Sequence, residues 1–139
     1  MERILIPVDG SKPSERAVRH VIRLRASGME LRALVLNVQE EWAPARSSKE
    51  EREGKRLHAR AANVATRRAR ALLIAAGVAY EVRMLVGPVA VQILKLARES
   101  RCRHIVMGMR GRGAIARVAL GSVSMKVLQL AEIPVTLVK

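Results

Sequence analysis

The sequence predicts an α/β fold: a single doubly wound domain over residues 1–139, with four helices and a parallel sheet of five strands. Three observations predict this fold. Short apolar segments rich in β-branched residues alternate with longer segments in which apolar residues recur every three or four positions. The short segments are apolar on both faces, as is typical of parallel strands covered on each side by helices. The length of 139 residues and the 50% hydrophobic content suit one domain with its own core.

The elements follow one another from the first residues of the chain. Strands are expected where aliphatic residues cluster, at residues 3–8, 31–38, 78–86, 104–108 and 133–138. Helices are expected where apolar residues have helical spacing, at residues 14–26, 49–76, 88–100 and 121–131. Gly28 and Gly77 end the first two helices, and Pro88 begins the third. The segment 39–48, which contains Trp42, has no periodicity and is expected to be a loop.

A glycine-rich segment between the fourth strand and the fourth helix is the strongest functional signal. Gly108 closes the strand, Gly111 follows it, and Gly121 and Ser122 stand where the helix begins. Glycines let the backbone approach a ligand closely, and the unpaired N–H groups of a helix start attract anions. The segment therefore indicates phosphate binding by the main chain, with a tight strand-to-helix connection as the alternative. Arg110 lies within it and is placed either to reach a polyphosphate or to stay solvated.

Two familiar phosphate motifs do not explain this segment. A P-loop needs Lys and then Ser or Thr after its last glycine, and here Ala114 and Ile115 follow Gly113. The residues 111–116 match the dinucleotide pattern in letters, but that pattern belongs after the first strand of its fold, and here it follows the fourth. We therefore treat this match as accidental.

Asp9 is the second candidate site residue and the only aspartate in the chain. It follows the first strand, so it is expected at the same edge of the sheet as the glycine-rich segment, where open α/β sheets bind ligands. A turn or helix-cap role is the alternative. For Ser122, a cap role and a phosphate-binding role are compatible.

The charge is unusual, because 26 Lys and Arg stand against 12 Asp and Glu, a formal net charge of +14. Such an excess favours polyanions, although the predominance of arginine is also explained by codon usage. Polar residues at steps of three and four form one stripe on the second helix, which consists of Arg52, Arg56, Arg60, Asn63, Arg67 and Arg70. This stripe is either a solvated face or a strip that binds nucleic acid or another polyanion. No helix-turn-helix or zinc pattern accompanies it.

The remaining features point to a cytoplasmic protein without membrane insertion. No apolar segment is long enough to cross a bilayer, and the chain enters a strand pattern directly after Met1 rather than a targeting peptide. The single cysteine, Cys102, fits a reducing compartment and is expected to be a buried or half-buried side chain. The histidines are scattered without metal-ligand spacing.

These features together resemble the universal stress protein family, specifically its ATP-binding branch. The branch is recognised by Gly-x2-Gly-x9-Gly-Ser/Thr, which Gly108, Gly111, Gly121 and Ser122 fill without a gap. ILIPVDGS at residues 4–11 is similar to the first strand and acidic turn of the family, and residues 121–139 are similar to its last helix and strand. The resemblance spans the chain and implies an adenine nucleotide alpha hydrolase-like sheet with strand order 3-2-1-4-5.

The resemblance also implies roles for particular residues in binding ATP, with or without Mg²⁺. Asp9 would face the ribose or a phosphate-bound metal, and Val38 would offer its backbone to the adenine edge. Pro7 and Val8 would help to wall the base, and Gly108 would lie under the ribose. The phosphates would be held by the main-chain N–H groups of Gly111, Gly121, Ser122 and Val123. The Ser122 hydroxyl would be a further donor, and Ser124 is a weaker candidate.

The function expected from these residues is a nucleotide-binding stress-response module rather than a dedicated enzyme. No paired carboxylates or Ser-His-Asp constellation can be assembled, and slow ATP hydrolysis is compatible with the site. A basic adaptor that binds nucleic acid or another polyanion remains the alternative. The apolar strand at residues 133–138 predicts a homodimer, because an uncovered edge of that kind tends to pair with a second copy.

Overall fold

The computed structural model describes residues 1–41, 43–109 and 120–139. It confirms the predicted fold class: five parallel strands in the order β3-β2-β1-β4-β5, with four helices. The elements in chain order are β1 (Glu2–Pro7), α1 (Lys12–Ala26), β2 (Leu31–Gln39), α2 (Ser48–Ala75), β3 (Tyr80–Val86), α3 (Val89–Glu99), β4 (His104–Gly108), α4 (Ser122–Leu130) and β5 (Val135–Val138). No helix in these described ranges is long and apolar enough to span a bilayer.

The predicted element boundaries hold to within two residues, and the differences have local causes. α1 begins at Lys12 rather than at residue 14, because Ser11 is its N-cap and accepts a hydrogen bond from the N–H of Ser14. β3 begins at Tyr80 rather than at residue 78, because Val78 still donates its N–H to Leu73 of α2. β5 likewise begins two residues later than predicted, after Pro134.

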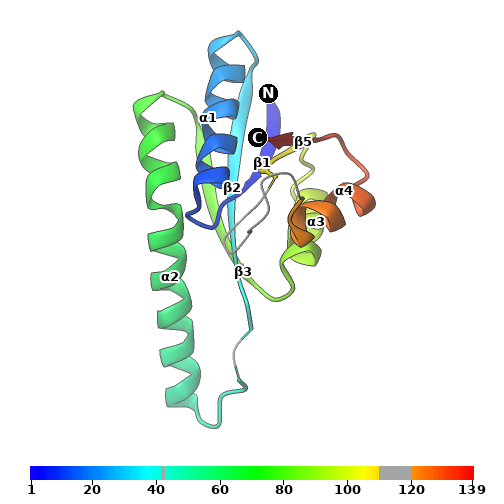
Figure 1. The fold of residues 1–139 in the computed structure, drawn as a ribbon. Coiled ribbons are helices and arrows are strands. Elements are labelled where there is room, and N and C mark those ends of the chain that lie inside the picture. Colours follow the sequence, from blue (N-terminus) through cyan, green and yellow to red (C-terminus); the bar gives the residue numbers. More distant parts are fainter. Residues whose placement is uncertain (42, 110–119) are drawn as a thin grey trace.

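The helices cover both faces of the sheet, as Figure 1 shows, with α1 and α2 on one side and α3 and α4 on the other. Successive residues of a strand point to opposite faces, so the buried strands fill two separate cores. Ile4, Ile6 and Val35 belong to the core under α1 and α2. Leu5 and Leu34 belong to the core under α3 and α4.

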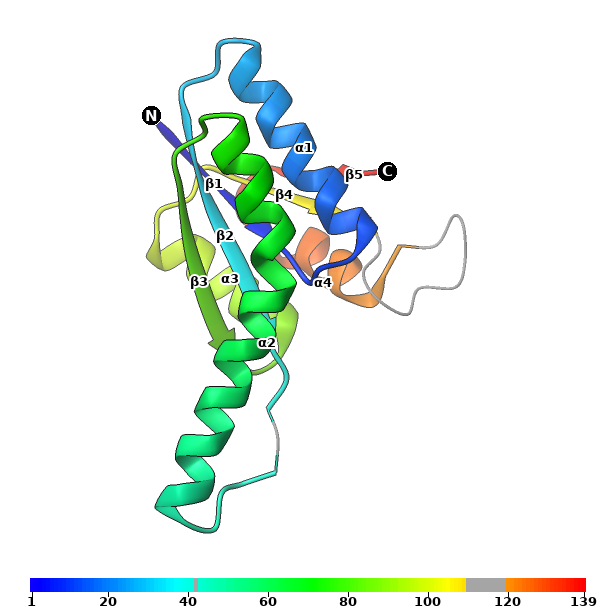
Figure 2. The ribbon, with the colours of Figure 1, turned by 90° about the vertical axis from the view of Figure 1, so that its left-hand side faces the viewer.

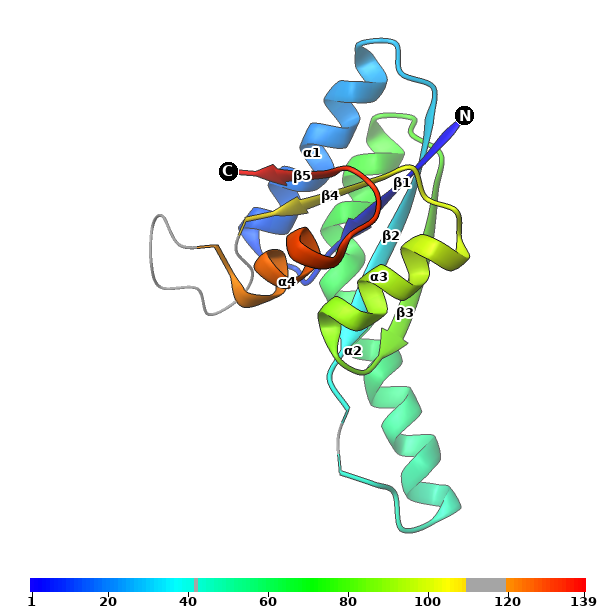
Figure 3. The same ribbon diagram turned by 90° about the vertical axis from the view of Figure 1, so that its right-hand side faces the viewer.

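Helix α2 is longer than the sheet that it covers. Its buried residues, Ala62, Thr66, Ala69 and Leu73, all lie in its second half, where it packs on the sheet. The first half projects past the carboxyl ends of β2 and β3, which is visible from two sides in Figures 2 and 3. Residues 48–61 are therefore held mainly by their own helix.

The strand order creates a crevice between β1 and β4. From β1 the chain passes to β2 on one side, and β4 and β5 lie on the other, so the connections diverge at this point. A buried side chain anchors the end of β1 beside the crevice: the Asn37 amide donates to the carbonyl of Val8 at 2.8 Å. The site described next lies at the carboxyl ends of these strands.

Candidate functional site

A cleft of about 490 Å³ opens at the carboxyl ends of the sheet strands, a volume typical of small-molecule sites. Its floor is apolar and includes Leu36, Ile93 and Met107, which belong to the core under α3 and α4. Its polar lining comes from the ends of β1 and β2 and the beginnings of α1 and α4. An apolar floor with a polar rim suits a ligand with a flat apolar part and a charged part.

The structure gathers nine of the predicted site residues around this one cleft. They come from four separate segments of the chain: Pro7, Val8, Asp9, Val38, Gly108, Gly121, Ser122, Val123 and Ser124. The other two, Arg110 and Gly111, lie outside the described residues, as does Trp42. The predicted residues that the structure describes thus share one place, although they are up to 117 positions apart in the sequence.

Several cleft residues were missed by sequence reasoning. Leu36 lies on the same face of β2 as Val38, so the two-residue period of a strand could have identified it as a cleft residue. Glu40 directly follows β2, so it stands at the same sheet edge as Asp9. Ser11 and Ser14 begin α1, and their place in the cleft depends on how that helix leaves β1. Val89 gave no signal, because its role rests on the packing of α3.

Helix α4 begins at the cleft without a side-chain cap. Its N-cap is Gly121, which has no side chain to accept a hydrogen bond, so the cap role considered for Ser122 is not realised. Gly121 itself donates its N–H to the carbonyl of Met109 at 2.9 Å. The N–H groups of Ser122, Val123 and Ser124 have no acceptor among the described residues, and α1 and α2 by contrast are capped by serines. The start of α4 therefore presents three N–H donors and a positive dipole end to the cleft.

Two contacts fix this helix start against the sheet. The Ser124 hydroxyl, 3% exposed, donates to the carbonyl of Gly108 at 3.0 Å. Gly108 in turn lies directly against α1, because a Cβ at this position would be 2.7 Å from the backbone carbon and oxygen of Pro13. Glycine at residue 108 is thus required by the packing of α1, and not only by the approach of a ligand.

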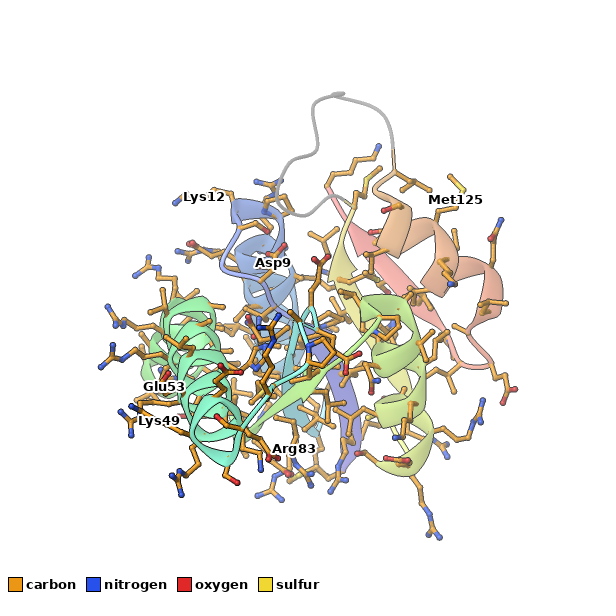
Figure 4. The ribbon with its side chains drawn as sticks, turned by 90° about the horizontal axis from the view of Figure 1, so that it is seen from below. Asp9, Lys12, Lys49, Glu53, Arg83 and Met125 are labelled. Atoms are coloured by element: carbon orange, nitrogen blue, oxygen red, sulfur yellow. The ribbon has the colours of Figure 1, made fainter. Side chains whose placement is uncertain are left out.

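Asp9 takes part in the turn that joins β1 to α1. One of its carboxylate oxygens accepts a hydrogen bond from the Ser11 N–H at 3.0 Å, and Gly10 between them has a φ of +83°. This bond realises the turn role and orients the carboxylate at the cleft rim. Figure 4 shows Asp9 at the start of α1, between that helix and the sheet. A structural and a ligand-binding role are therefore compatible at this residue.

The backbone of Val38 points past the end of β1. In a parallel sheet the N–H and C=O of one residue face the same neighbour, and the next residue faces the other. Leu36 accepts from the Val8 N–H at 2.8 Å, and Gln39 accepts from the Gly87 N–H at 3.0 Å, so even-numbered residues of β2 face β1. Because the pairing with β1 ends opposite Leu36, the N–H and C=O of Val38 meet no strand on that side. They offer one donor and one acceptor at the cleft.

The other reactive side chains lie elsewhere. Within the described ranges, no group of three or more His, Cys, Asp or Glu residues could hold a metal ion. Cys102 is buried under α3, and burial raises the pKa of its thiol to about 11. His104 bonds Thr136 of β5 at 2.7 Å, and burial lowers its pKa below the ordinary value. Neither residue lines the cleft.

Comparison with known proteins identifies the family of the chain. The sequence model of the universal stress protein family matches residues 1–139. Universal stress protein MJ0531 of Methanocaldococcus jannaschii is 31% identical over 147 residues, which cover 99% of this chain and 82% of that protein.

Solved structures of similar proteins share the fold. The structure of hypothetical protein MJ0577, used as a structural-genomics test of assigning biochemical function, superposes with a TM-score of 0.82 at 26% identity, covering 99% of this chain and 95% of that one. A universal stress protein in complex with cAMP superposes with a TM-score of 0.68 at 25% identity, with the same coverage of both chains. From the match over its whole length and the identity to a curated relative, this chain belongs to the universal stress protein family.

Proposed function

We propose that the cleft binds ATP and that the protein acts as a nucleotide-dependent stress-response module. The observation that carries the proposal is the uncapped start of α4, which turns the N–H groups of Ser122, Val123 and Ser124 toward the cleft. Three convergent main-chain donors at a helix N-terminus suit a phosphate chain. Gly111 completes the Gly-x2-Gly-x9-Gly-Ser/Thr motif in the sequence, and Arg110 directly precedes Gly111.

The other end of the cleft suits an adenine base. Val38 offers a backbone donor and acceptor, the pair of groups that the edge of adenine complements. Pro7, Val8 and Leu36 supply apolar walls for the ring. The complex of a related universal stress protein with cAMP supports an adenine nucleotide as the class of ligand.

Carboxylates at the cleft rim suit a magnesium ion carried by the nucleotide. Mg²⁺ is usually held by one or two carboxylates together with substrate phosphates. Asp9 lines the cleft and would hold it together with phosphate oxygens, while the ion would neutralise phosphate charge. The carboxylates of the cleft would otherwise repel the phosphates, so ATP affinity is expected to rise with Mg²⁺.

Binding rather than turnover is the function that this lining supports. The described lining residues include carboxylates and hydroxyls but no histidine, lysine or arginine that would orient a water or stabilise a leaving phosphate. Slow hydrolysis remains compatible with such a site. ATP and a reduced Cys102 are both expected in the cytoplasm, where we place the protein.

The test is calorimetric titration of ATP and Mg²⁺ into nucleotide-free protein. Gly121→Asp places a carboxylate at the N-cap of α4, where its φ of −63° accepts any residue. This variant should keep or gain stability, because aspartate is a good N-cap, and should bind ATP at least about tenfold more weakly, because the carboxylate occupies the donors and repels phosphate.

The matched control is Ser47→Asp, which adds the same charge at the N-cap of α2, away from the cleft. It should bind ATP like the unmodified protein. Equal loss in both variants, or equal affinity for ATP and inorganic triphosphate, would show that net charge rather than the cleft captures the nucleotide. An absence of binding in folded, nucleotide-free protein would refute the proposal.

We further propose that the protein is a homodimer joined through the outer edge of β5. Pro134 and Val138 accept hydrogen bonds from the N–H groups of Ile105 and Met109, so even-numbered residues there face β4. The N–H and C=O of Val135 therefore face outward, and no described strand pairs with that edge. An open edge of this kind suits a second copy.

Val135→Pro removes an outward N–H without removing a hydrogen bond to β4, so the variant should fold as a monomer. The control is Met84→Pro, which makes the same change at the outward edge of β3 on the other side of the sheet. Sedimentation should give a monomer for the first variant and a dimer for the second. A dimeric Val135→Pro protein would contradict this interface.

A further inference from the structure

The positive charge of the protein is concentrated on one side of the sheet. Helix α1 carries five basic residues (Lys and Arg) and one Glu, and α2 carries eight basic residues and three Glu. On the opposite side, α3 carries two basic residues and one Glu, and α4 carries a single lysine. The α1 and α2 layer therefore holds a net charge of +9 against +2 on the α3 and α4 layer. The cleft proposed to bind ATP lies at the carboxyl ends of the strands, and not on the outer surface of either layer.

The exposed cations of the two helices form one surface, which we call the basic face. It consists of Lys12, Arg16, Arg19 and Arg23 of α1 and Arg56, Arg60, Arg67 and Arg68 of α2, all solvent-exposed. On α1 they recur at steps of three and four, whereas on α2 Arg56, Arg60 and Arg67 share one side of the helix and Arg68 lies about 100° around it from Arg67. Each row extends over about 17 Å at 1.5 Å per residue. Figure 1 shows α1 beside the second half of α2. Gly10 lies against Ala65, and Glu15 pairs with Arg68, so the two rows overlap only near Arg67 and Arg68 and together extend over about 30 Å.

The acidic residues of this layer do not offset the basic face. The carboxylate of Glu15 is shared by three cations, Arg19 at 2.9 Å, Arg68 at 3.6 Å and Lys12 at 3.8 Å, and the hydrogen bond from Arg19 holds its pKa below the ordinary value. The ion pair with Arg68 joins α1 to α2 and so fixes one row relative to the other. The three glutamates of α2 stand at residues 50–53, and no acid follows until residue 81.

The geometry favours a duplex over other anions. A run of cations about 30 Å long suits the regular row of phosphates along a duplex, and guanidinium groups bind phosphate in a bidentate manner. A single strand would need aromatic stacking, and no Phe, Tyr or Trp lies on α1 or α2. A lipid surface would favour a continuous apolar stripe, whereas the exposed apolar residues of α2, Leu57, Val64 and Ile74, are seven and ten positions apart.

We propose that the basic face binds the phosphate backbone of double-stranded nucleic acid, without reading its sequence. This surface differs from the stripe predicted on α2 alone. Arg70 of that stripe is half-buried and donates to the carbonyl and side-chain oxygens of Asn63 at 3.0 and 3.1 Å, so it is engaged within the helix. The inference is independent of ATP binding, because the two surfaces share no residue.

The experiment is fluorescence anisotropy of a labelled duplex DNA of about 20 base pairs at several salt concentrations. Arg16→Gln, Arg60→Gln and Arg67→Gln are combined in one variant, since none of these three forms an ion pair with a described residue. The matched control combines Lys95→Gln, Arg98→Gln and Lys126→Gln, exposed cations of the opposite layer. Both triple variants have the same net charge.

The basic-face variant should bind the duplex at least about tenfold more weakly, and its slope of log affinity against log salt should fall by about 2–3, near 0.9 for each phosphate that the variant no longer neutralises. The control should stay close to the unmodified protein, and both variants should bind ATP normally. Equal losses in the two triple variants, no binding by the folded protein, or equally strong binding to anionic vesicles would each overturn the proposal. Loss of duplex binding in Gly121→Asp would assign the phosphate to the cleft instead.

Discussion

Replacing Gly108 by alanine tests the close approach of β4 to the start of α1. The added Cβ would lie 2.7 Å from the backbone carbon, the carbonyl oxygen and the Cβ of Pro13, and an ordinary contact begins near 3.4 Å. The start of α1 must therefore move away from β4 by about 0.7 Å, against a closely packed core. Strain of this kind costs about 1–3 kcal/mol, which corresponds to a Tm roughly 4–12 °C lower for a domain of this size.

The assay is urea and thermal unfolding followed by circular dichroism, with Gly54→Ala as the matched control. Gly54 lies inside α2 with nothing within 4 Å of the position of a Cβ, so the same chemical change should stabilise the protein by about 0.5–1 kcal/mol. The two variants should thus shift the free energy of unfolding in opposite directions. Equal stability of Gly108→Ala and the unmodified protein would refute the close packing of β4 on α1.

Three further results are expected from His104, Cys102 and Ser124. Burial lowers the pKa of His104 in the folded state, so below about pH 6.5 the unfolded chain binds more protons than the folded protein. The free energy of unfolding should therefore decrease as the pH is lowered from about 6.5 to the folded pKa. In urea titrations, His104→Gln should flatten this dependence. With a thiol pKa of about 11 and 5% exposure, Cys102 should react with a thiol reagent at pH 8 only as fast as the protein opens, and rapid labelling of the native protein would contradict its burial. Ser124→Ala should cost about 1 kcal/mol through the lost bond to Gly108, while the exposed Ser122→Ala should change stability by less than about 0.5 kcal/mol in the same unfolding assay.

The fold could be predicted because its signals are local. Apolar runs, helical periodicity and the glycines that end helices locate all nine elements, and Gly28 and Gly77 do adopt positive φ where α1 and α2 end. The ends of β3 and β5 were less predictable. Val78 is apolar and buried like a strand residue, yet its N–H bonds back to α2, and a sequence does not distinguish a buried turn residue from a strand residue.

The cleft was predictable only in part, because its residues come together through packing. Asp9 and Gly121 carry motif signals, whereas Glu40, Ser14 and Val89 line the same space without one. Even where a site residue is predicted correctly, the structural reason for its identity can differ from the one that the motif suggests. Gly108 was predicted for its approach to a ligand, and the structure shows that Pro13 of α1 already excludes a side chain there.

The distribution of charge separates the two anion-binding proposals by their physics. The described lining of the cleft holds carboxylates and main-chain N–H donors, so the +14 of the chain does not arise from that lining. ATP binding there should rest on short-range hydrogen bonds and a helix dipole, which salt weakens only modestly, whereas contacts from the basic face to a duplex should weaken steeply with salt through counterion release. Raising the salt concentration should therefore remove duplex binding while the cleft still binds ATP. If both affinities fell with the same slope, ATP would be held by the general positive field rather than by the start of α4.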